Sequence, residues 1–346
     1  MKTCRWRKRN KPISRTMRAI VYTRYGTPDV LHLEEADKPA PTENEVLVKV
    51  YASSINSWDA DLLKGNHFLI RMLGGLFRPK HKILGADIAG VVETAGEKVT
   101  SFKSGDAVIG DIAGAGFGGF AEYVSVPEKL LAPKSAAMHF EQAAALPQAG
   151  LLMLQGLRYK KPLQPGQHLL INGAGGSVGT LAVQYAKTMG CEVTCVDKEI
   201  KFDLLRSLGA DHLIDFTKED YTRSGKQYDY ILDLVAHRSV SSYKRALKPG
   251  GVFSMVGGSM GGLLLRLALF GKWISKRSGK NLGIMGYRPR RQDLEELNHL
   301  FEQGKVQPVI DKVFPLQETA AAFRYFVEGS FKGKIIIQVT DERPGE

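Results

Sequence analysis

The first half of the chain alternates hydrophobic and polar residues over short stretches that glycines separate. Alternation with a period of two predicts half-buried strands at residues 17–22, 46–51, 87–93, 107–110 and 120–126. In the second of these, Lys49 is the polar residue that points outward. Many short strands with glycine turns and little helix predict a barrel-like or folded-sheet domain.

Near residue 140 the hydrophobic period changes to that of a helix. Helices are expected at 140–146 and 151–159, before a turn at 162–166. Strands are then expected at 168–172, 192–196, 212–215, 228–234 and 251–256, and helices at 177–189, 199–208 and 240–247. Alternating strands and helices of this length predict a parallel sheet with helices on both faces.

The last part of the chain has amphipathic helices at 292–303 and 317–328 and a final strand at 334–339. We expect this tail to return to the first domain. The expected fold class is therefore α/β. A β-rich catalytic domain comprises residues 17–140 and 288–346, and a doubly wound parallel sheet is inserted between these parts at 141–287.

Positive charge is concentrated at the amino terminus. The chain has 346 residues and a formal net charge of +12, and residues 1–16 contain seven basic and no acidic residues. A disordered basic arm can bind nucleic acid or an anionic membrane, or direct a protein to an organelle. We favour a fourth interpretation, in which Met17 is the native start, and we expect no nucleic-acid partner.

The cysteines and the apolar runs give no sign of a metal site or a membrane span. Cys4, Cys191 and Cys195 fit no metal-ligand spacing, and their odd number without a secretory signal predicts reduced thiols in the cytoplasm. The most apolar run, residues 261–270, contains Arg266 and is too short to cross a bilayer.

A glycine-rich turn at residues 173–179 carries the strongest local signal. It follows an apolar strand and leads directly into an amphipathic helix, in the register Ala174-x-Gly176-x-x-Gly179. Gly176 lets the backbone approach a pyrophosphate over the helix amino terminus, and Gly179 lets the helix pack closely on the strand. We therefore predict dinucleotide contacts from Ala174, Gly175, Gly176, Ser177, Val178 and Gly179.

Further cofactor contacts are expected at the carboxyl ends of the neighbouring strands. Asp197 lies 18 residues beyond Gly179, where an acid binds the adenosine ribose of NAD(H). Lys198 and Lys201 favour the 2′-phosphate of NADP(H) instead, so the choice between NADH and NADPH stays open. Val235, Gly257 and Gly258 end two other strands and are expected beside the nicotinamide.

With the turn in place, the chain resembles the quinone oxidoreductase-like branch of the zinc-free medium-chain dehydrogenase/reductase superfamily. Residues 172–179 and 182–187 resemble its nucleotide loop. The resemblance extends in order from Met17 to the carboxyl terminus through 54–59, 84–92, 102–108, 119–124, 143–150, 208–211, 247–251 and 333–334.

The resemblance implies a GroES-like catalytic domain, an inserted Rossmann domain, an active site between them and a homodimer. Asn56 and Asp59 fall on the family's Asn-x-x-Asp pattern beside the nicotinamide, and Lys334 falls on its carboxyl-terminal Gly-Lys near the cofactor. Zinc alcohol dehydrogenases place ligands near Asn56, Ala86 and residues 149–150, where this chain has none. We therefore predict no metal. A Gly-x-Tyr of some relatives is replaced by Gly65-Asn-His67, which removes a tyrosine proton donor.

Without zinc, hydride addition to an acceptor that delocalises its own charge is the expected chemistry. We predict an NAD(P)H-dependent reductase of quinones or α,β-unsaturated carbonyls. Asn56 and Asp59 are candidate site residues, the latter equally a helix cap, and His67 is the candidate proton donor. Three alternatives remain: a 2-enoyl or enone reductase specifically, an NAD(P)H-binding interaction protein without turnover, and a zinc alcohol dehydrogenase.

Overall fold

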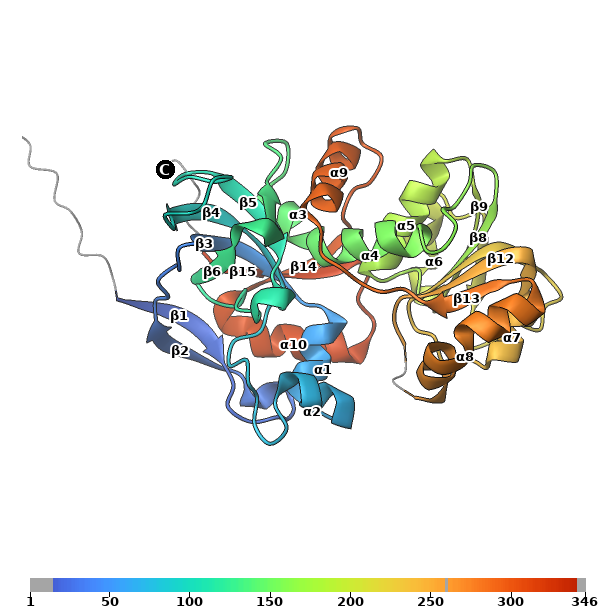
Figure 1. The fold of residues 1–346 in the computed structure, drawn as a ribbon, viewed down its shortest axis with the longest axis horizontal. Coiled ribbons are helices and arrows are strands. Elements are labelled where there is room, and N and C mark those ends of the chain that lie inside the picture. Colours follow the sequence, from blue (N-terminus) through green and yellow to red (C-terminus); the bar gives the residue numbers. More distant parts are fainter. Residues whose placement is uncertain (1–14, 259–260, 341–346) are drawn as a thin grey trace, which may run out of the picture.

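The computed structural model describes residues 15–258 and 261–340, which form two sheet-based bodies side by side (Figure 1). All but the last two residues of the predicted basic arm lie outside this range, as do residues 341–346. Strands of the first half and the tail build one body, and the alternating region between them builds the other. The predicted α/β fold class is confirmed.

Six parallel strands form one sheet, in the order β10-β9-β8-β11-β12-β13. Their bounds are β8 His168–Asn172, β9 Glu192–Asp197, β10 His212–Asp215, β11 Tyr228–Asp233, β12 Leu247–Met255 and β13 Asn281–Ile284. The direction of strand progression reverses beside β8. Ligands of doubly wound sheets bind at such a switch point, beyond the carboxyl ends of the strands.

Helices cover this sheet because their apolar residues recur at helical spacing. In α5 (Ser177–Thr188), Leu181, Ala182 and Ala186 are fully buried, and the helix packs on β8 and β9. The other helices of this body are α4 Pro147–Leu157, α6 Phe202–Ser207, α7 Val240–Ala246 and α8 Gly262–Ser278.

The second body is a mostly antiparallel sheet in the order β14-β15-β3-β4-β5-β7, with β6 also paired to β3. Its strands are β3 Glu45–Ser54, β4 Asp87–Ala95, β5 Ala107–Asp111, β6 Tyr123–Pro127, β7 Leu131–Pro133, β14 Ile310–Pro315 and β15 Lys334–Gln338. β1 Thr16–Val21 and β2 His32–Asp37 form a separate hairpin. The helices are α1 Ser57–Lys64, α2 Phe68–Gly74, α3 Phe140–Ala145, α9 Arg291–Glu302 and α10 Thr319–Glu328.

One hydrophobic core runs through both bodies. Ala52 and Ile109 of the antiparallel sheet belong to the same buried cluster as Leu169 and Ile171 of the parallel sheet. The buried side chains of α3 and α4, such as Leu151, fill the space between them. This shared core fixes the two sheets relative to each other, which a site between them requires.

Most strands lie where the hydrophobic pattern predicts them, and the differences have local causes. The strand predicted at 120–126 begins at Tyr123, because the backbone of Phe120 bonds to Leu84 and Ile20 outside the ladder. The helix predicted from residue 199 opens with a 3₁₀ turn, and α6 begins at Phe202. The pattern missed α2, α8, β2, β7, β13 and β14, and α1, the helix that Asp59 was offered as a cap for, begins at Ser57.

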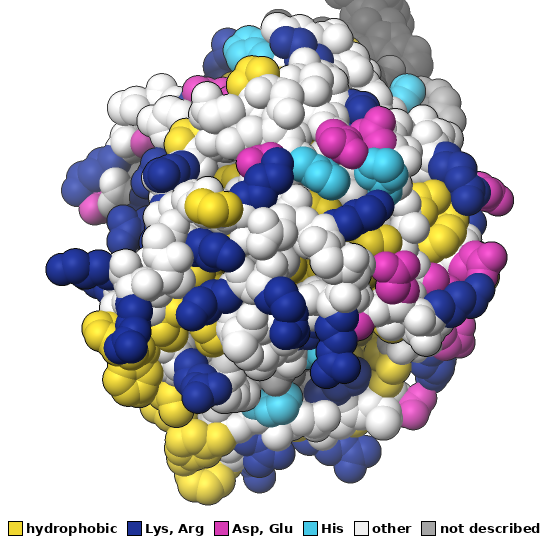
Figure 2. Space-filling view, turned by 90° about the vertical axis from the view of Figure 1, so that its right-hand side faces the viewer, with side chains coloured by type: hydrophobic (Ala, Val, Ile, Leu, Met, Phe, Trp, Pro, Cys, Tyr) yellow, Lys and Arg dark blue, Asp and Glu magenta, His cyan; other side chains and the backbone are white. Residues whose placement is uncertain are grey.

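Helix α8 was missed because its apolar residues surround the whole helix and show no single buried stripe. Leu267 faces the core, whereas Leu265, Leu269 and Trp273 are each about 60–65% exposed. The face of the protein that contains α8 shows this hydrophobic group at the lower left of Figure 2. Within the described residues, no helix is long and apolar enough to span a membrane.

Candidate active site

The glycine-rich turn joins β8 to α5 and forms a cradle that only small residues permit. Gly176 precedes the first turn of α5 with extended backbone. A Cβ at Gly179 would lie 2.4–2.6 Å from the Ala174 backbone, and one at Gly175 would lie 2.3 Å from the Lys201 side chain. The free N–H groups of the first helical turn and the helix dipole suit an anionic diphosphate. The residues present therefore fit a dinucleotide.

Asp197, at the end of β9, faces the glycine turn. Its carboxylate accepts hydrogen bonds from the backbone N–H of Gly175 (2.7 Å) and of Lys198 (2.8 Å), and Lys201 Nζ lies 3.6 Å away. The Lys201 side chain is almost fully buried, whereas Lys198 is exposed. The negative charge that would repel a 2′-phosphate is thus partly balanced by a lysine within the same site.

A cleft of about 360 Å³ lies over this turn. Gly173 and Gly176 form its floor, and Asp197, Lys198 and Lys201 line one part. Val235 and His237 come from the loop after β11. Gly329 and Phe331 come from the segment before β15. Both bodies therefore contribute to the predicted cofactor site.

Backbone hydrogen bonding joins the two bodies at the glycine turn itself. Gly333 N–H donates to Gly175 O over 2.9 Å, and Gly176 and Gly333 form an isolated parallel bridge. The next residue, Lys334, begins β15 and extends its side chain into the antiparallel body.

A buried polar network surrounds Lys334. Its Nζ donates to Asn56 Oδ1 and to Asp87 Oδ2, the latter over 3.0 Å. Asp87 Oδ2 also accepts from Ser54 Oγ (2.7 Å) and Asn56 Nδ2 (3.0 Å), while Asp87 Oδ1 accepts from Gln148 N–H (2.8 Å). Lys334 and Asp87 are 2% and 0% exposed, so this is an ion pair in a low-dielectric interior.

Gln148 extends the network to two more side chains. Its Nε2 donates to Asp111 Oδ2 over 3.3 Å, and the Tyr287 hydroxyl donates to the same oxygen. Burial and the nearby Asp87 carboxylate raise the pKa of Asp111 above its usual range. Burial, followed by the Asp111 charge, raises the pKa of Tyr287 well above the ordinary value, so Tyr287 stays a proton donor.

Asp59 lies beside this network and fixes the start of α1. Its two oxygens accept from the backbone N–H groups of Asn56 and Gly85, each over 2.9 Å. Burial raises the pKa of Asp59 to about 7 although both amides favour the ionised form. Asp59 is the third residue of α1 and completes a capping box whose N-cap is Asn56, so the helix begins before the residue that the sequence suggested as its cap.

We expect Asp59 to give the protein a pH-dependent stability that Asp59→Asn removes. The pKa of Asp59 is about 7 in the folded protein and about 4 when unfolded. Its contribution is therefore present below about pH 4 and is lost as the pH rises through 7, by a few kcal/mol. Urea unfolding from pH 4 to 8 should show a shallower fall for the variant. If the free energy of unfolding fell equally with pH in both proteins, Asp59 would not be the source of the pH dependence.

The structure brings together some of the predicted site residues and separates others. Asn56 and Lys334 are in contact with each other. Of the residues predicted to bind the dinucleotide, those that line the cleft are Gly176, Asp197, Lys198, Lys201 and Val235. His67 is exposed at the start of α2 and belongs to no hydrogen bond of the network. Gly257 and Gly258 pack on the backbone of residues 234 and 236, where a Cβ would lie 2.3 Å from a carbonyl oxygen.

Sequence reasoning missed Asp87, Asp111, Gln148 and Tyr287. Asp87 begins β4 and Asp111 ends β5, and the two residues are partners in the antiparallel ladder. Pairing the two predicted strands would have placed these two carboxylates opposite each other. Two buried carboxylates in such a position would have indicated a polar site. Tyr287 gives no such signal, because its loop belongs to the stretch without a predicted element.

A zinc ion does not fit the donors of this network. At the positions of the zinc ligands of alcohol dehydrogenases, the chain has Asn56, Ala86 and residues 149–150, without cysteine or histidine. Both oxygens of Asp87 already have donors, and the Lys334 ammonium occupies the place of a cation beside it. Zinc sites need several thiolate, imidazole or carboxylate ligands.

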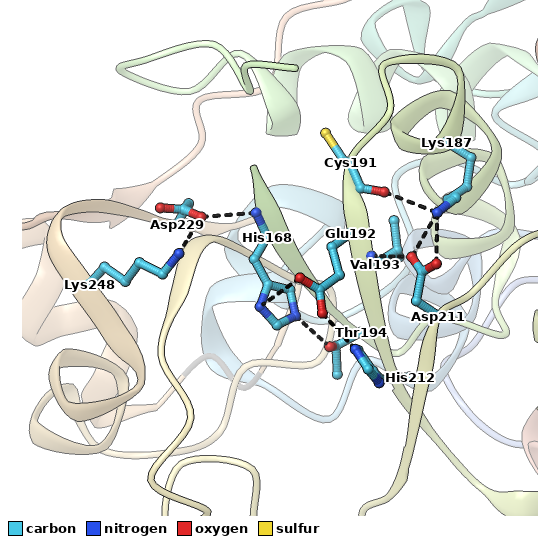
Figure 3. Close-up of polar contacts among 10 residues, drawn as sticks. All are labelled: His168, Lys187, Cys191, Glu192, Val193, Thr194, Asp211, His212, Asp229 and Lys248. Carbon is cyan, nitrogen blue, oxygen red and sulfur yellow. Dashed lines mark hydrogen bonds and ion pairs between the residues drawn. The ribbon is translucent and has the colours of Figure 1, made fainter. Parts of the chain in front are cut away.

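A separate group of His and Glu side chains lies at the opposite, amino-terminal edge of the parallel sheet (Figure 3). His168, Glu192 and His212 are the first residues of β8, β9 and β10. Glu192 contacts His212 Nε2 at 2.6 Å and His168 Nδ1 at 3.8 Å, and Thr194 Oγ1 lies 2.8 Å from His168 Nε2. Within the described ranges, this is the one cluster whose donors converge as metal ligands would.

Two family descriptions match the chain: "Alcohol dehydrogenase GroES-like domain" over residues 42–136 and "Zinc-binding dehydrogenase" over residues 208–337. The chain is 34% identical to 2-methylene-furan-3-one reductase of Solanum lycopersicum, over 93% of the chain and 79% of the relative. It is 33% identical to an NADPH-dependent alkenal/one oxidoreductase of Arabidopsis thaliana, with coverage of 94% and 80%. The quinone oxidoreductase of Coxiella burnetii superposes with a TM-score of 0.84 at 28% identity, over 94% of this chain and all of that one.

Proposed function

We propose that this chain, which belongs to the medium-chain dehydrogenase/reductase superfamily and to its quinone oxidoreductase-like branch, reduces quinones or α,β-unsaturated carbonyls with NAD(P)H and without a metal. The observation that carries the proposal is the buried Asn56–Asp87–Lys334 network next to the glycine turn. In that network a lysine ammonium stands where a metal would be needed to stabilise an alkoxide.

The reaction adds one hydride from C4 of the reduced nicotinamide, and one proton, to the acceptor. The glycine turn and the start of α5 would hold the diphosphate, while Asn56 and Lys334 would orient the nicotinamide half. Lys334 uses two of its three N–H donors within the protein, which leaves one for the ligand. A quinone or enone spreads the incoming charge over its conjugated oxygen, so positioning supplies most of the rate.

Turnover with a panel of acceptors tests the proposal. We expect NADPH or NADH oxidation with a quinone, a 2-enal and an enone, and no oxidation of simple alcohols by NAD(P)⁺. Comparing kcat/KM for the quinone and the 2-enal decides between a general quinone reductase and a dedicated enone reductase. Tight dinucleotide binding with no turnover of any acceptor would favour a binding protein instead.

Metal analysis has to distinguish the buried network, whose donors do not fit zinc, from the cluster of His168, Glu192 and His212. We expect quinone reduction to survive dialysis against a chelator. Zinc in the purified protein should disappear in His212→Ala, since His212 belongs to the cluster at the far edge of the sheet. Zinc that persists in His212→Ala and is needed for turnover would overturn the metal-free mechanism.

Lys198 is expected to select NADPH over NADH. Its exposed ammonium lines the cleft next to Asp197, whose charge Lys201 partly balances. Lys198→Ala should raise the Kd for NADPH about tenfold and leave the Kd for NADH within about twofold. The expected loss for NADPH is that of one charge-assisted hydrogen bond between the Lys198 ammonium and the 2′-phosphate. Fluorescence titration of both dinucleotides measures this. An equal loss for both would show that Lys198 contacts their common part.

His67 tests the source of the proton. The imidazole is exposed and lies outside the buried network, so water can donate the proton to the substrate in its place. We expect His67→Ala to retain kcat for a quinone and for a 2-enal within about threefold. A loss of about a hundredfold or more with the 2-enal would identify His67 as a general acid.

We further propose that the protein is a homodimer, as the family resemblance implies, and that it lies in the cytoplasm, as its odd number of cysteines without a secretory signal indicates. Light scattering of the purified chain and of a chain that begins at Met17 tests the oligomeric state. Cell fractionation of the same two chains tests the location and the role of the basic arm. A stable monomer, or an organellar location that needs residues 1–16, would contradict the respective part.

A further inference from the structure

Positive charge in the folded part of the chain is concentrated in two segments that contain no acidic residue. Residues 234–292 contain twelve lysines and arginines and no aspartate or glutamate. Residues 62–86 contain five basic residues and again no acidic one. The remainder of the chain beyond residue 16 carries more acidic than basic residues. The two segments therefore create a local positive potential that the net charge understates.

The first acid-free segment includes α8, whose outer surface is apolar. Leu265, Leu269, Phe270 and Trp273 are each more than half exposed, at a spacing that aligns them along one side of the helix. Arg266, Lys272, Lys276 and Arg277 are exposed on the same side of the helix and are interspersed with these apolar side chains. Lys244 of α7 completes the wall of a groove of about 500 Å³. In Figure 2 the lower left shows hydrophobic side chains bordered by basic ones, without acidic side chains.

The second acid-free segment repeats this composition on the other body. In α2 and the turn after it, Phe68, Met72, Leu73 and Phe77 are 55–87% exposed. The basic side chains of this segment are Lys64, Arg71, Arg78, Lys80 and Lys82. Both α2 and α8 lie along the lower side of the molecule in Figure 1, one on each body.

We propose that α2 and α8 form one lipid-binding face that rests on an anionic bilayer. Helices with Trp, Phe and Leu on one side and Lys and Arg beside them bury their apolar side chains at the headgroup boundary. Acidic lipid headgroups complement the basic rim. A second copy docked on this face through a two-fold axis would bring two copies of the same basic surface together, which like-charge repulsion opposes. Nucleic acid would leave the apolar stripe without a partner.

This inference does not rest on the proposed reaction, and a vesicle assay tests it without substrate. The full chain is sedimented with vesicles of phosphatidylcholine, either alone or with about a third of phosphatidylglycerol. Binding is expected only to the anionic vesicles and should be lost at about 1 M salt, where the screening length is about 3 Å. The emission of Trp273, obtained as the difference from Trp273→Phe, should shift to the blue on binding.

Two exposed-surface variants locate the binding face. Neutralising Arg266, Lys272 and Arg277 to Gln should lower partitioning about a hundredfold, at about fivefold per charge. Leu269→Ser with Trp273→Ser should also release the protein. The control variant neutralises Lys103, Lys129 and Lys305, which are exposed outside both segments, and should bind as the parent does. Unchanged thermal melting confirms that every variant is folded.

Four outcomes would overturn the proposal. These are equal binding to neutral vesicles, full binding by the α8 variants, and binding that disappears only when residues 1–16 are removed. The fourth is a change of oligomeric state in the α8 variants without any lipid binding by the parent, which would assign the face to a second copy.

Discussion

Gly176→Val is expected to abolish the binding of NADPH and NADH while the protein stays folded. A Cβ at Gly176 meets only Gly173 O, at 3.6 Å, and the extended backbone there accepts a β-branched residue. Its side chain would instead fill the floor of the cleft, where the diphosphate has to approach the helix. We expect the Kd to rise at least a hundredfold and the Tm to change by less than about 3 °C.

A neighbouring glycine gives the contrast. Gly179→Ala places its Cβ within 2.6 Å of the Ala174 backbone, so the turn itself has to move and stability falls together with binding. Gly262→Ala, at the start of α8 with open space around it, serves as the neutral control. Calorimetric titration and thermal melts of the three variants separate lost binding from lost folding. Near-normal affinity in Gly176→Val would place the dinucleotide elsewhere.

Lys334→Met should have the second large effect, on both stability and turnover. Removing the ammonium leaves the Asp87 carboxylate buried and without its counter-charge, which costs about 3–5 kcal/mol. It also removes the donor that we assign to the nicotinamide half of the cofactor. We expect kcat/KM for a quinone to fall at least a hundredfold.

A second substitution distinguishes these two consequences. Asp87→Asn added to Lys334→Met removes the uncompensated charge, so most of the lost stability should return. An amide at this position still accepts the Gln148 N–H. Turnover should not return, because the donor at residue 334 is still missing. If urea unfolding and kcat/KM recover together, the role of Lys334 is structural only.

The parts of the fold that follow from local sequence were predictable. Strands β8 and β10 have the bounds that alternation and flanking turns indicate, and the glycine turn between β8 and α5 follows from residue types alone. Here the backbone conformation and the close approach of helix and strand depend on residues near each other in sequence. Asp197 was placed correctly at the end of its strand for the same reason.

The buried network was not predictable in this way, because it depends on pairings over long sequence distances. Lys334 reaches Asp87 only because β15 pairs with β3, and β3 with β4. Tyr287 meets Asp111 across 176 residues. Helix α8 was missed because exposed apolar residues, such as Leu265 and Trp273, accompany the buried Leu267 and obscure the helical period. We propose that these exposed apolar residues bind a bilayer, and rules that fold a chain by itself do not anticipate such a partner.

The short tie between Gly333 and Gly175 bears on how such enzymes can be recombined. A protein engineer who exchanges the central nucleotide-binding insert for that of a relative would normally join the pieces at its two ends. Here Gly333, just before the last strand, supplies a backbone contact to the insert, and Lys334, the first residue of that strand, supplies a cation to the other half. A functional chimaera therefore has to treat residues 329–334 as a shared component and match them to both parents.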